Sequence, residues 1–346
     1  MGIKKPVVVV KLGSAALTHA DGSINKTVIK AIAHDLAMLQ QNNHILVVSS
    51  GAVACGKAFI SQYSGTISQK KAAASIGNPL LLEQYRKALK PHQLQVAQAL
   101  CERGHFANRK QFLQLKQTIE TLWQENIIPI ANENDVVSDL ELKFSDNDEL
   151  AMLFALAFNA DVLLIGSSIN GLMDLNGNIV NTVKEINKEV FSWVRNEKSA
   201  TGLGGMHSKL TCARLANKLG IKTTLFGATQ PGALLSAFKG ESGTQFFPAK
   251  STVNARQKWL AGGSLVSGKI VVDAGAAQAI LSRKSLLLVG VIQFVGSFEK
   301  GEIVEIQTEN NETIALAKVK MSMKEAEQSN NKKGIEVANA NEIVMI

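Results

Sequence analysis

The sequence is poor in cysteine, in aromatic residues and in long apolar runs. Its three cysteines lie far apart in 346 residues and form no CxxC pair, and an odd number cannot close completely into disulfides. A reducing compartment therefore fits best. The longest apolar run, residues 150–158, falls short of the roughly 18 to 20 residues that span a membrane. The apolar start at 7–10 ends at Lys11 and is too short for a signal peptide, so we expect a protein of the cytoplasm.

The sequence also lacks a closely spaced set of metal ligands. Its six histidines are scattered, and no two of them stand at a metal-ligand spacing such as HxxxH. We therefore predict no metal ion that protein side chains hold directly.

The formal net charge of +8 belongs to the larger, N-terminal part of the chain. Residues 261–346 hold nine lysines and arginines against ten aspartates and glutamates, so the whole positive excess lies before residue 261. The basic clusters there, at 4–5, 70–71 and 109–110, are short. Tight binding to a nucleic-acid backbone needs clustered Lys and Arg, so these clusters favour a solvated surface over a polyanion groove.

Apolar runs of strand length alternate with helical segments over the first 227 residues. Strands are predicted at 7–12, 45–48, 94–100, 127–131, 162–165 and 223–226, and helices at 80–89, 112–123, 148–158 and 206–219. A further helix follows Asn25, which can cap it, with apolar residues from Val28 to Leu39 on one face. Continuously apolar strands separated by helices predict an α/β fold with a mainly parallel sheet covered on both faces.

The pattern changes after about residue 255. Residues 256–267 are rich in Gly and Ser and are interpreted as a linker. Short strand-like runs follow at 269–272, 286–295, 302–308, 313–320 and 342–346, with one helix at 275–282. The sequence thus predicts a large domain over 1–255 and a small, mostly-β domain over 268–346.

Polar and glycine-rich segments lie where the predicted strands end, which is where parallel sheets bind ligands. KLGS at 11–14 places a lysine beside exposed backbone N–H groups, which suits phosphate oxygens. TGLGGMHSK at 201–209 precedes a helix and adds helix-terminal donors and Lys209. Taken singly, a lysine at a strand end, as in KLGS, is more often simply exposed to solvent. The second segment is neither a Walker A motif nor a GxGxxG after a strand, and a plain flexible loop remains an alternative.

Acidic and amide residues gather in NEND at 132–135 and SDND at 145–148. Such a cluster can bind an ammonium group, orient lysines or hold Mg²⁺, although alone it is more often a turn or a helix cap. SSGAV at 49–53 supplies small hydrogen-bonding groups at another strand end, or forms a tight turn. Together with the two lysine-containing segments, these features point to phosphoryl transfer.

Five segments, KLGS, SSGAVACG, IIPIANENDVV, KFSDNDELA and GGMHSKL, occur in this order along the chain. The ordered set resembles the amino-acid kinase family, in particular its glutamate 5-kinases, over essentially the whole chain. The tail from about Gly268, with IVVDAGAAQAIL, resembles the PUA domain that many bacterial members carry. The resemblance implies the amino-acid-kinase three-layer sandwich with a mainly parallel central sheet, followed by a small, mostly-β PUA-like domain.

The resemblance also implies an activity. ATP and L-glutamate would give L-glutamyl 5-phosphate, the first step towards proline. Mg²⁺ would enter with ATP, the enzyme would be a homo-oligomer (dimer or tetramer), and proline would inhibit it at or beside the glutamate site. The short apolar runs of the sequence separately predict no membrane partner. The acceptor carboxylate is ionised at neutral pH, so two lysines, Mg²⁺ and glycine-loop amides suit the transfer without a general base.

Site residues follow from the resemblance position by position. Lys11 and Lys209 would stabilise the transferring phosphoryl group, and Asp148 would hold the two lysines. Glutamate would bind to Ser50, Asp135 and Asn147, with Gly51, Asn134 and Asp146 nearby. ATP would lie against Lys11, Gly13, Ser167, Ser168, Leu203, Gly204, Gly205, Met206, His207, Ser208 and Lys209.

Two departures from the family pattern lie on the nucleotide side. Ser167 and Ser168 stand where the family has Thr-Asp, and Leu203 stands where a threonine is usual. Losing one polar contact typically costs about 0.5 to 1.5 kcal/mol, so we expect weaker ATP binding with the mechanism retained. The alternative is a nucleotide-impaired paralogue that regulates or binds RNA through the PUA-like domain. The acidic balance of residues 261–346 does not favour RNA binding.

Overall fold

A computed structural model describes residues 5–137, 147–194, 205–248, 266–329 and 334–345. The chain divides into two compact units, one formed by Met1–His105 and Lys110–Ser251 and the other by Phe106–Arg109 and Thr252–Ile346. Of the predicted linker at 256–267, residues 256–265 lie outside the described residues, and Val266 already begins a strand. The predicted domain limits at 255 and 268 therefore stay predictions.

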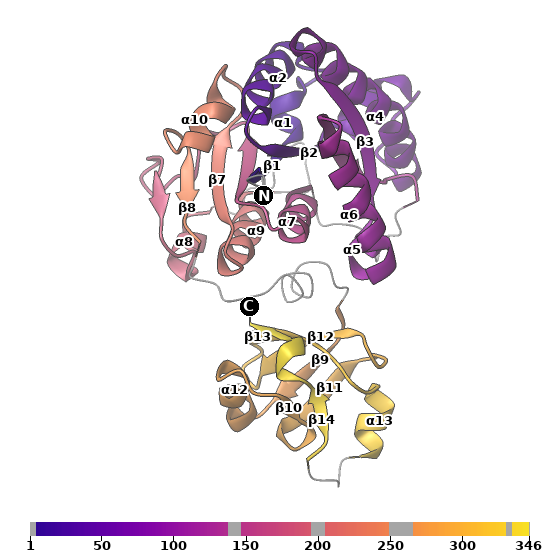
Figure 1. The fold of residues 1–346 in the computed structure, drawn as a ribbon, viewed down its shortest axis with the longest axis vertical. Coiled ribbons are helices and arrows are strands. Elements are labelled where there is room, and N and C mark those ends of the chain that lie inside the picture. The colour runs from indigo at the N-terminus through magenta and orange to yellow at the C-terminus, as the bar shows by residue number, and fades with distance from the viewer. Residues whose placement is uncertain (1–4, 138–146, 195–204, 249–265, 330–333, 346) are drawn as a thin grey trace. The chain divides into compact units, whose positions relative to one another are not determined.

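The described part of the N-terminal unit is built on one sheet of eight strands in the order β3-β4-β2-β1-β5-β7-β8-β6 (Figure 1). Its strands are β1 (Val7–Leu12), β2 (His44–Ser49), β3 (Gln95–Cys101), β4 (Ile127–Glu133), β5 (Val162–Ser167), β6 (Thr182–Val183), β7 (Lys222–Gly227) and β8 (Thr244–Phe246). The six strands from β3 to β7 in this order pair in parallel, and β8 runs antiparallel to β7. The predicted mainly parallel sheet is confirmed.

Helices cover both faces of this sheet (Figure 1). They are α1 (Ser14–Leu17), α2 (Lys26–Gln40), α3 (Ala52–Gly56), α4 (Ile67–Leu89), α5 (Arg103–Ala107), α6 (Arg109–Gln124), α7 (Asn147–Ala157), α8 (Lys188–Ser192), α9 (Met206–Lys218) and α10 (Ala233–Lys239), with the 3-10 helices η1 (Lys57–Phe59) and η2 (Lys90–His92). On one face α2 packs against α4 and α10, and on the other α7 packs against α9. Two helical layers around a sheet form the predicted three-layer sandwich.

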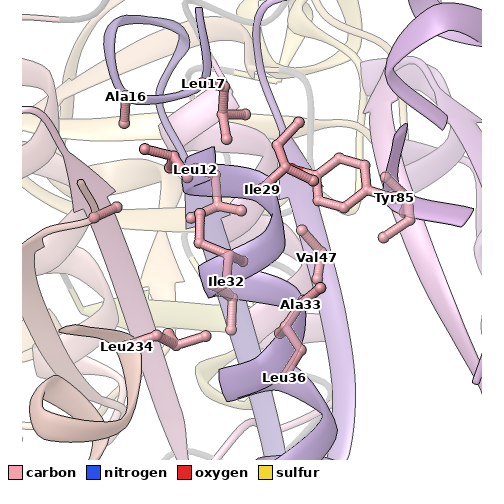
Figure 2. Packing of buried hydrophobic residues seen from close by; sticks show 14 of the residues in the cluster. Leu12, Ala16, Leu17, Ile29, Ile32, Ala33, Leu36, Val47, Tyr85 and Leu234 are labelled. Carbon is pink, nitrogen blue, oxygen red and sulfur yellow. The ribbon is translucent and has the colours of Figure 1, made fainter. Parts of the chain in front are cut away.

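Successive side chains of β1 point alternately to the two faces of the sheet. Val8, Val10 and Leu12 belong to the core cluster that the sheet shares with α2. Figure 2 shows part of this cluster, with Leu12, Ala16, Leu17, Ile29, Ile32, Ala33, Leu36, Val47, Tyr85 and Leu234 labelled. Because successive side chains of a strand point to opposite faces, Lys11 points to the face that α7 and α9 cover.

The helix predicted at 80–89 is much longer in the structure, where α4 spans Ile67–Leu89. Its sequence contains Gly77 and Pro79, which usually interrupt helices. In the fold the glycine is needed where α4 crosses α3, because a Cβ at Gly77 would overlap the carbonyl oxygen of Ala52. Most other predicted elements are correct to within a few residues. One shift matters for the site: β4 runs on to Glu133, so Asn132 belongs to the sheet.

The described part of the C-terminal unit has a five-stranded sheet, β11-β9-β12-β13-β15, and the strand pair β10-β14. Its elements are β9 (Val266–Val272), α12 (Ala274–Leu281), β10 (Leu286–Leu287), η3 (Leu288–Gly290), β11 (Val291–Gly296), β12 (Ile303–Thr308), β13 (Thr313–Lys318), α13 (Met323–Gln328), β14 (Glu336–Ala338), η4 (Ala340–Glu342) and β15 (Ile343–Met345). The mostly-β prediction is confirmed. The single strand predicted over 286–295 is wrong, because η3 interrupts it.

Candidate active site

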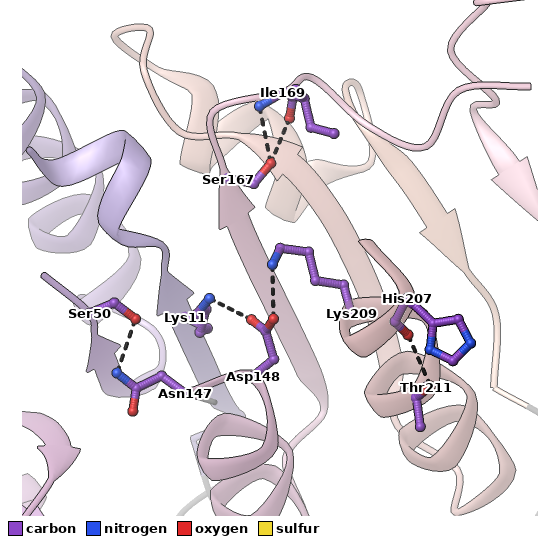
Figure 3. Close-up of polar contacts among 9 residues, drawn as sticks. All are labelled: Lys11, Ser50, Asn147, Asp148, Ser167, Ile169, His207, Lys209 and Thr211. Carbon is purple, nitrogen blue, oxygen red and sulfur yellow. Dashed lines mark hydrogen bonds and ion pairs between the residues drawn. The ribbon is translucent and has the colours of Figure 1, made fainter. Parts of the chain in front are cut away.

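A buried carboxylate joins two lysines that come from distant parts of the chain. Lys11 lies on β1, Asp148 in the first turn of α7, and Lys209 near the start of α9. Lys11 Nζ is 2.6 Å from Asp148 Oδ1, and Lys209 Nζ is 2.9 Å from Asp148 Oδ2 (Figure 3). Lys11 is 4 % exposed, Lys209 9 % and Asp148 0 %. The structure thus brings the three predicted catalytic residues together.

Burial and the two ammonium groups set the charge of this lysine cluster, Lys11–Asp148–Lys209. Burial on its own raises the pKa of Asp148, but the charges and hydrogen bonds of the two lysines outweigh it, so this pKa lies below its ordinary value. The N-terminus of α7 adds further positive potential beside the carboxylate. With two ammonium groups and one carboxylate, the cluster carries one net positive charge in a place nearly without water. Such a charge acts strongly on an anion.

The strand ends beside the lysine cluster are tied together by backbone hydrogen bonds. Gly13 N donates to Gly166 O at 3.0 Å, which joins the ends of β1 and β5, and Ser50 N donates to Leu12 O at 3.0 Å. A Cβ at Gly13 would lie 3.7 Å from Lys11 Nζ. Gly51 has φ of 106°, which a residue with a side chain rarely adopts. The backbone therefore passes close to the ammonium group of Lys11.

Two predicted glutamate-binding residues, Ser50 and Asn147, are joined by a hydrogen bond. Asn147 Nδ2 donates to Ser50 Oγ at 3.0 Å (Figure 3). The same Nδ2 lies 2.8 Å from Asn132 Oδ1 and 3.3 Å from Ser49 O. Because Asn147 directly precedes Asp148 on α7, this polar group lies beside the lysine cluster.

The other predicted glutamate-binding residues lie in the turn that follows β4. Asn134 is held against the end of β3, where its backbone N donates to Cys101 O at 2.9 Å and its Nδ2 donates to Glu102 Oε1 at 3.0 Å. Asp135 is the next residue and is partly buried. Asp146 lies outside the described residues.

The start of α9 contains most of the predicted nucleotide-binding segment that the structure describes. Gly205 is the N-cap residue, and Met206, His207 and Ser208 form the first turn. The His207 ring packs against Phe191, with ring centres 4.9 Å apart. Leu203 and Gly204 lie outside the described residues.

Ser167 and Ser168, the departures from the family pattern, lie at the end of β5. Ser167 Oγ donates to Ile169 O at 3.0 Å and accepts from Ile169 N at 3.1 Å (Figure 3). The hydroxyl of Ser167 is therefore used inside its own loop. Ser168 is exposed.

The sequence predicts Asn132 only as part of the acidic and amide cluster at 132–135, without a role of its own, and does not indicate Arg103 at all. Asn132 is 6 % exposed, and an asparagine that directly continues an apolar strand is the signal that marks it. Arg103 Nη1 lies 2.6 Å from Glu149 Oε1, next to Asp148. No motif or spacing in the sequence indicates this ion pair.

Within the described ranges, no group of three His, Cys, Asp or Glu side chains could hold a metal ion. Both oxygens of Asp148 face ammonium groups. Nor is any helix in the described part of the chain long and apolar enough to cross a membrane.

Two family models match the sequence. The amino acid kinase family matches residues 6–227, and the PUA domain matches residues 268–340. The glutamate 5-kinase of Trichlorobacter lovleyi is 38% identical over 310 residues, which cover 86% of this chain and 82% of the relative. The glutamate 5-kinase of Geobacter metallireducens is 38% identical over 333 residues, which cover 93% of this chain and 89% of the relative.

A solved structure of a kinase is also similar. The carbamate kinase from Giardia lamblia bound to AMP-PNP matches with a TM-score of 0.52, covering 71% of this chain and 99% of that chain. The sequence identity is 15%, so this likeness shows the fold alone.

Proposed function

Because the chain belongs to the amino acid kinase family, we propose that it is a glutamate 5-kinase. It transfers the γ-phosphoryl group of ATP to the side-chain carboxylate of L-glutamate and gives L-glutamyl 5-phosphate and ADP. The relatives that cover most of the chain are glutamate 5-kinases. The structural observation that supports this function most strongly is the single carboxylate of Asp148 bound to both Lys11 and Lys209.

The reaction requires that the two substrates be positioned and that their negative charges be neutralised. The acceptor carboxylate of glutamate is already ionised at neutral pH. One of its oxygens forms a bond to the γ-phosphorus while the bond from that phosphorus to ADP breaks, so no proton has to be removed from the acceptor. The enzyme must bring two anions into line and stabilise the charge on the equatorial phosphoryl oxygens.

Lys11 and Lys209 are placed to do this together. Their ammonium groups bind the two oxygens of one carboxylate, so they lie close enough to contact one phosphoryl group from two sides. Asp148 offsets their mutual repulsion and keeps both charges paired in a buried place, where an unpaired charge is costly. Asp148 therefore acts as a positioning residue for the two catalytic lysines.

The glutamate substrate would occupy the space beside Ser50, Asn147 and Asp135. The hydroxyl and amide groups suit the carboxylates of glutamate, and the carboxylate of Asp135 suits its ammonium group. Gly51, Asn134 and Asp146 would lie at the border of this space. The position of Asn147 directly before Asp148 supports an acceptor site that adjoins the lysine cluster.

ATP would approach from the strand ends and the start of α9. Gly13, Lys11 and the residues from Leu203 to Lys209 would contact the phosphates, where the N-terminus of a helix favours anions. Ser168 replaces a carboxylate of the family pattern, and the Ser167 hydroxyl is used within its loop. We therefore expect ATP to bind more weakly than with the usual Thr-Asp pair.

Mg²⁺ fits this site as an ion carried by the nucleotide. The described residues include no metal-holding cluster, and the Asp148 oxygens bind lysines. The nucleotide's phosphates would hold Mg²⁺, which would neutralise part of their charge. Lys11 and Lys209 would act on the oxygens of the transferring group.

Feedback inhibition by proline, a homo-oligomeric state and a place in the cytoplasm complete the proposal. The first two derive from the family resemblance, the third from the few, scattered cysteines and the short apolar start of the sequence, and each stays a prediction. The PUA-domain match does not by itself make RNA a substrate or partner here, because residues 266–346 contain more acidic than basic side chains.

A coupled assay of ADP release, combined with hydroxylamine trapping of the acyl phosphate, tests the proposed function. We expect ADP release that depends on L-glutamate, with one hydroxamate formed per ADP. L-Aspartate and N-acetyl-L-glutamate should give none. ADP release without hydroxamate, or equal activity with N-acetyl-L-glutamate, would show that the substrate is wrong.

A further inference from the structure

A row of side-chain amides, two of them buried and one half-buried, connects the proposed glutamate site to helix α4. Asn147 Nδ2 donates to Asn132 Oδ1 at 2.8 Å, and Asn132 Nδ2 donates to Asn78 Oδ1 at 2.7 Å. Asn132 is 6 % exposed and Asn78 is 8 % exposed. Ser50 joins the row through its hydrogen bond from Asn147. We call Asn78, Asn132 and Asn147 the amide row.

Two backbone groups at the amide row fix the orientation of its side chains. Glu133 N, which can only donate, donates to Asn132 Oδ1 at 2.9 Å. Asn132 must therefore turn its Nδ2 towards Asn78, and Asn78 must present its oxygen. Ser49 O, which can only accept, lies 3.3 Å from Asn147 Nδ2. Asn147 is therefore oriented with Nδ2 towards Ser50 as well.

This orientation determines what Ser50 can offer to a substrate. Since Ser50 Oγ accepts a hydrogen bond from Asn147, its own hydroxyl hydrogen remains to be donated to another group. A hydroxyl donor suits a carboxylate, whereas an ammonium group needs an acceptor. The bond from Asn147 occupies one of the two lone pairs of Ser50 Oγ and leaves its hydrogen to face another group, so the amide row favours Ser50 as a donor to an anionic oxygen.

Asn78 lies at one end of the amide row, and Ser50 is bonded to the other end. Asn78 lies within α4, between Gly77 and Pro79, and is buried with the core residues Ala74 and Leu81 of the same helix. A buried amide costs stability unless it is hydrogen-bonded, and Asn132 supplies that bond. An apolar side chain would fill this helix position without needing a partner.

We propose that Asn78 is a positioning residue for substrate binding, which acts through Asn132 and Asn147 to keep Ser50 a donor towards a carboxylate of the amino-acid substrate. The inference rests on the proposed function and deepens it. Glu133 N and Ser49 O still set which atom of each amide faces which partner. Without the Asn78 acceptor, however, Asn132 Nδ2 is left unpaired in a buried place, so the side chains of Asn132, Asn147 and Ser50 are held less tightly. Lys11, Asp148 and Lys209 form a separate ion-pair cluster and remain in place.

The first test compares Asn78→Ala with a matched control in the full-length protein. One lost hydrogen bond is worth about 0.5 to 1.5 kcal/mol, so KM for glutamate should rise about two- to twelvefold. We expect kcat and KM for ATP to stay within about twofold, since the lysine cluster is untouched. Asn43 is the control: it is 7 % exposed and donates to Leu39 O at 2.7 Å, outside the amide row. Asn43→Ala should change none of the three constants.

A double-mutant cycle with Ser50→Ala tests whether Asn78 acts through Ser50. Once the hydroxyl is gone, Asn78→Ala should raise KM for glutamate less than about twofold further, because coupled residues are not additive. Full additivity would overturn the proposal. An effect of Asn78→Ala on kcat alone, or on KM for ATP as much as on KM for glutamate, would also overturn it.

Asn78→Asp provides the conservative variant, because it keeps the shape of the side chain and burial favours its neutral carboxyl group. It keeps an acceptor oxygen for Asn132 Nδ2, so KM for glutamate should remain within about twofold of wild type, and a tenfold rise would contradict the proposal. The two hypotheses can fail separately. Wild-type protein that forms no hydroxamate from glutamate refutes the proposed function. Active wild-type protein with unchanged kinetics in Asn78→Ala refutes only the role of Asn78.

Discussion

Replacement of Lys209 by methionine should abolish turnover while the protein stays folded. The side chain is 9 % exposed, so its aliphatic part is already buried, and methionine fills a similar volume without the charge. Asp148 keeps its ion pair with Lys11 at 2.6 Å, so no carboxylate is left unpaired. The net charge of the lysine cluster falls from one positive charge to zero, and the transferring phosphoryl group loses one of its two ammonium contacts.

The expected loss of kcat in Lys209→Met follows from the electrostatics of such contacts. Removing one preorganised donor to a charged transition state costs about 2.7 to 4 kcal/mol, which corresponds to about 10² to 10³ in kcat. We take this as the minimum for Lys209→Met, because the lost donor carries a full charge. The stability loss should be smaller, about 1 to 2 kcal/mol, or a few degrees in Tm for a domain of this size.

Hydroxamate formation measures turnover, and thermal unfolding followed by circular dichroism measures folding. Lys218→Met is the matched control, because Lys218 lies in the last turn of the same helix α9 and should leave kcat within about twofold of wild type. Near-normal kcat in a folded Lys209→Met protein would refute the reasoning. So would an equal loss in both variants, which would indicate damage to α9 and not to the lysine cluster.

The remaining predictions concern two carboxylates. Asp148→Asn should lower kcat and reduce the free energy of unfolding, measured with denaturant, by about 3 to 5 kcal/mol. The reason is that two buried ammonium groups lose their shared counter-charge. An unchanged free energy of unfolding would contradict this. The pKa of Asp148 is depressed in the folded state, so its contribution to stability is fully present above the unfolded pKa of about 3.9 and is lost as the pH falls through the folded pKa. The stability difference between wild type and Asp148→Asn should therefore be constant from about pH 5 to 8, and a difference that disappears between pH 6 and 8 would count against it. Asp135→Ala should mainly raise KM for glutamate in steady-state kinetics, whereas a change confined to ATP would contradict its role.

Most of the N-terminal sheet could be predicted because its strands are buried on both faces. β1 matches the predicted range 7–12, and β5 begins at the predicted Val162, since a run of Val, Leu and Ile leaves few other interpretations. The first half of α4 could not be predicted. Gly77 and Pro79 resemble helix breakers, and only the close packing of α3 against α4 makes the glycine favourable.

The run over 286–295 shows a similar limit in the C-terminal unit. Its residues are apolar apart from Gln293, so the sequence predicts one strand. In the fold, Gly290 packs where a Cβ would overlap the Ala276 side chain of α12. The chain turns there through η3 before β11 pairs with β9. A contact with helix α12, and not a local preference of the sequence, ends the first strand.

Some site residues could be predicted from the sequence and others could not. The lysines and Asp148 could be found because they stand in motifs that resemble a family. The strand alternation that turns Lys11 towards α7 also follows from the sequence. The amide row could not be found, because the orientation of Asn132 depends on Glu133 N and that of Asn147 on Ser49 O. The three asparagines of the amide row come from α4, β4 and α7, and no regular spacing in the sequence indicates that they meet.

A crystal structure of the protein with L-glutamate, ADP, Mg²⁺ and a planar phosphoryl mimic such as aluminium fluoride would show whether both lysines contact the transferring group. We expect Lys11 Nζ and Lys209 Nζ both to lie within about 3 Å of the mimic, with Asp148 still bound to at least one of them. A mimic contacted by only one of the two lysines, or bound away from Asp148, would contradict this expectation.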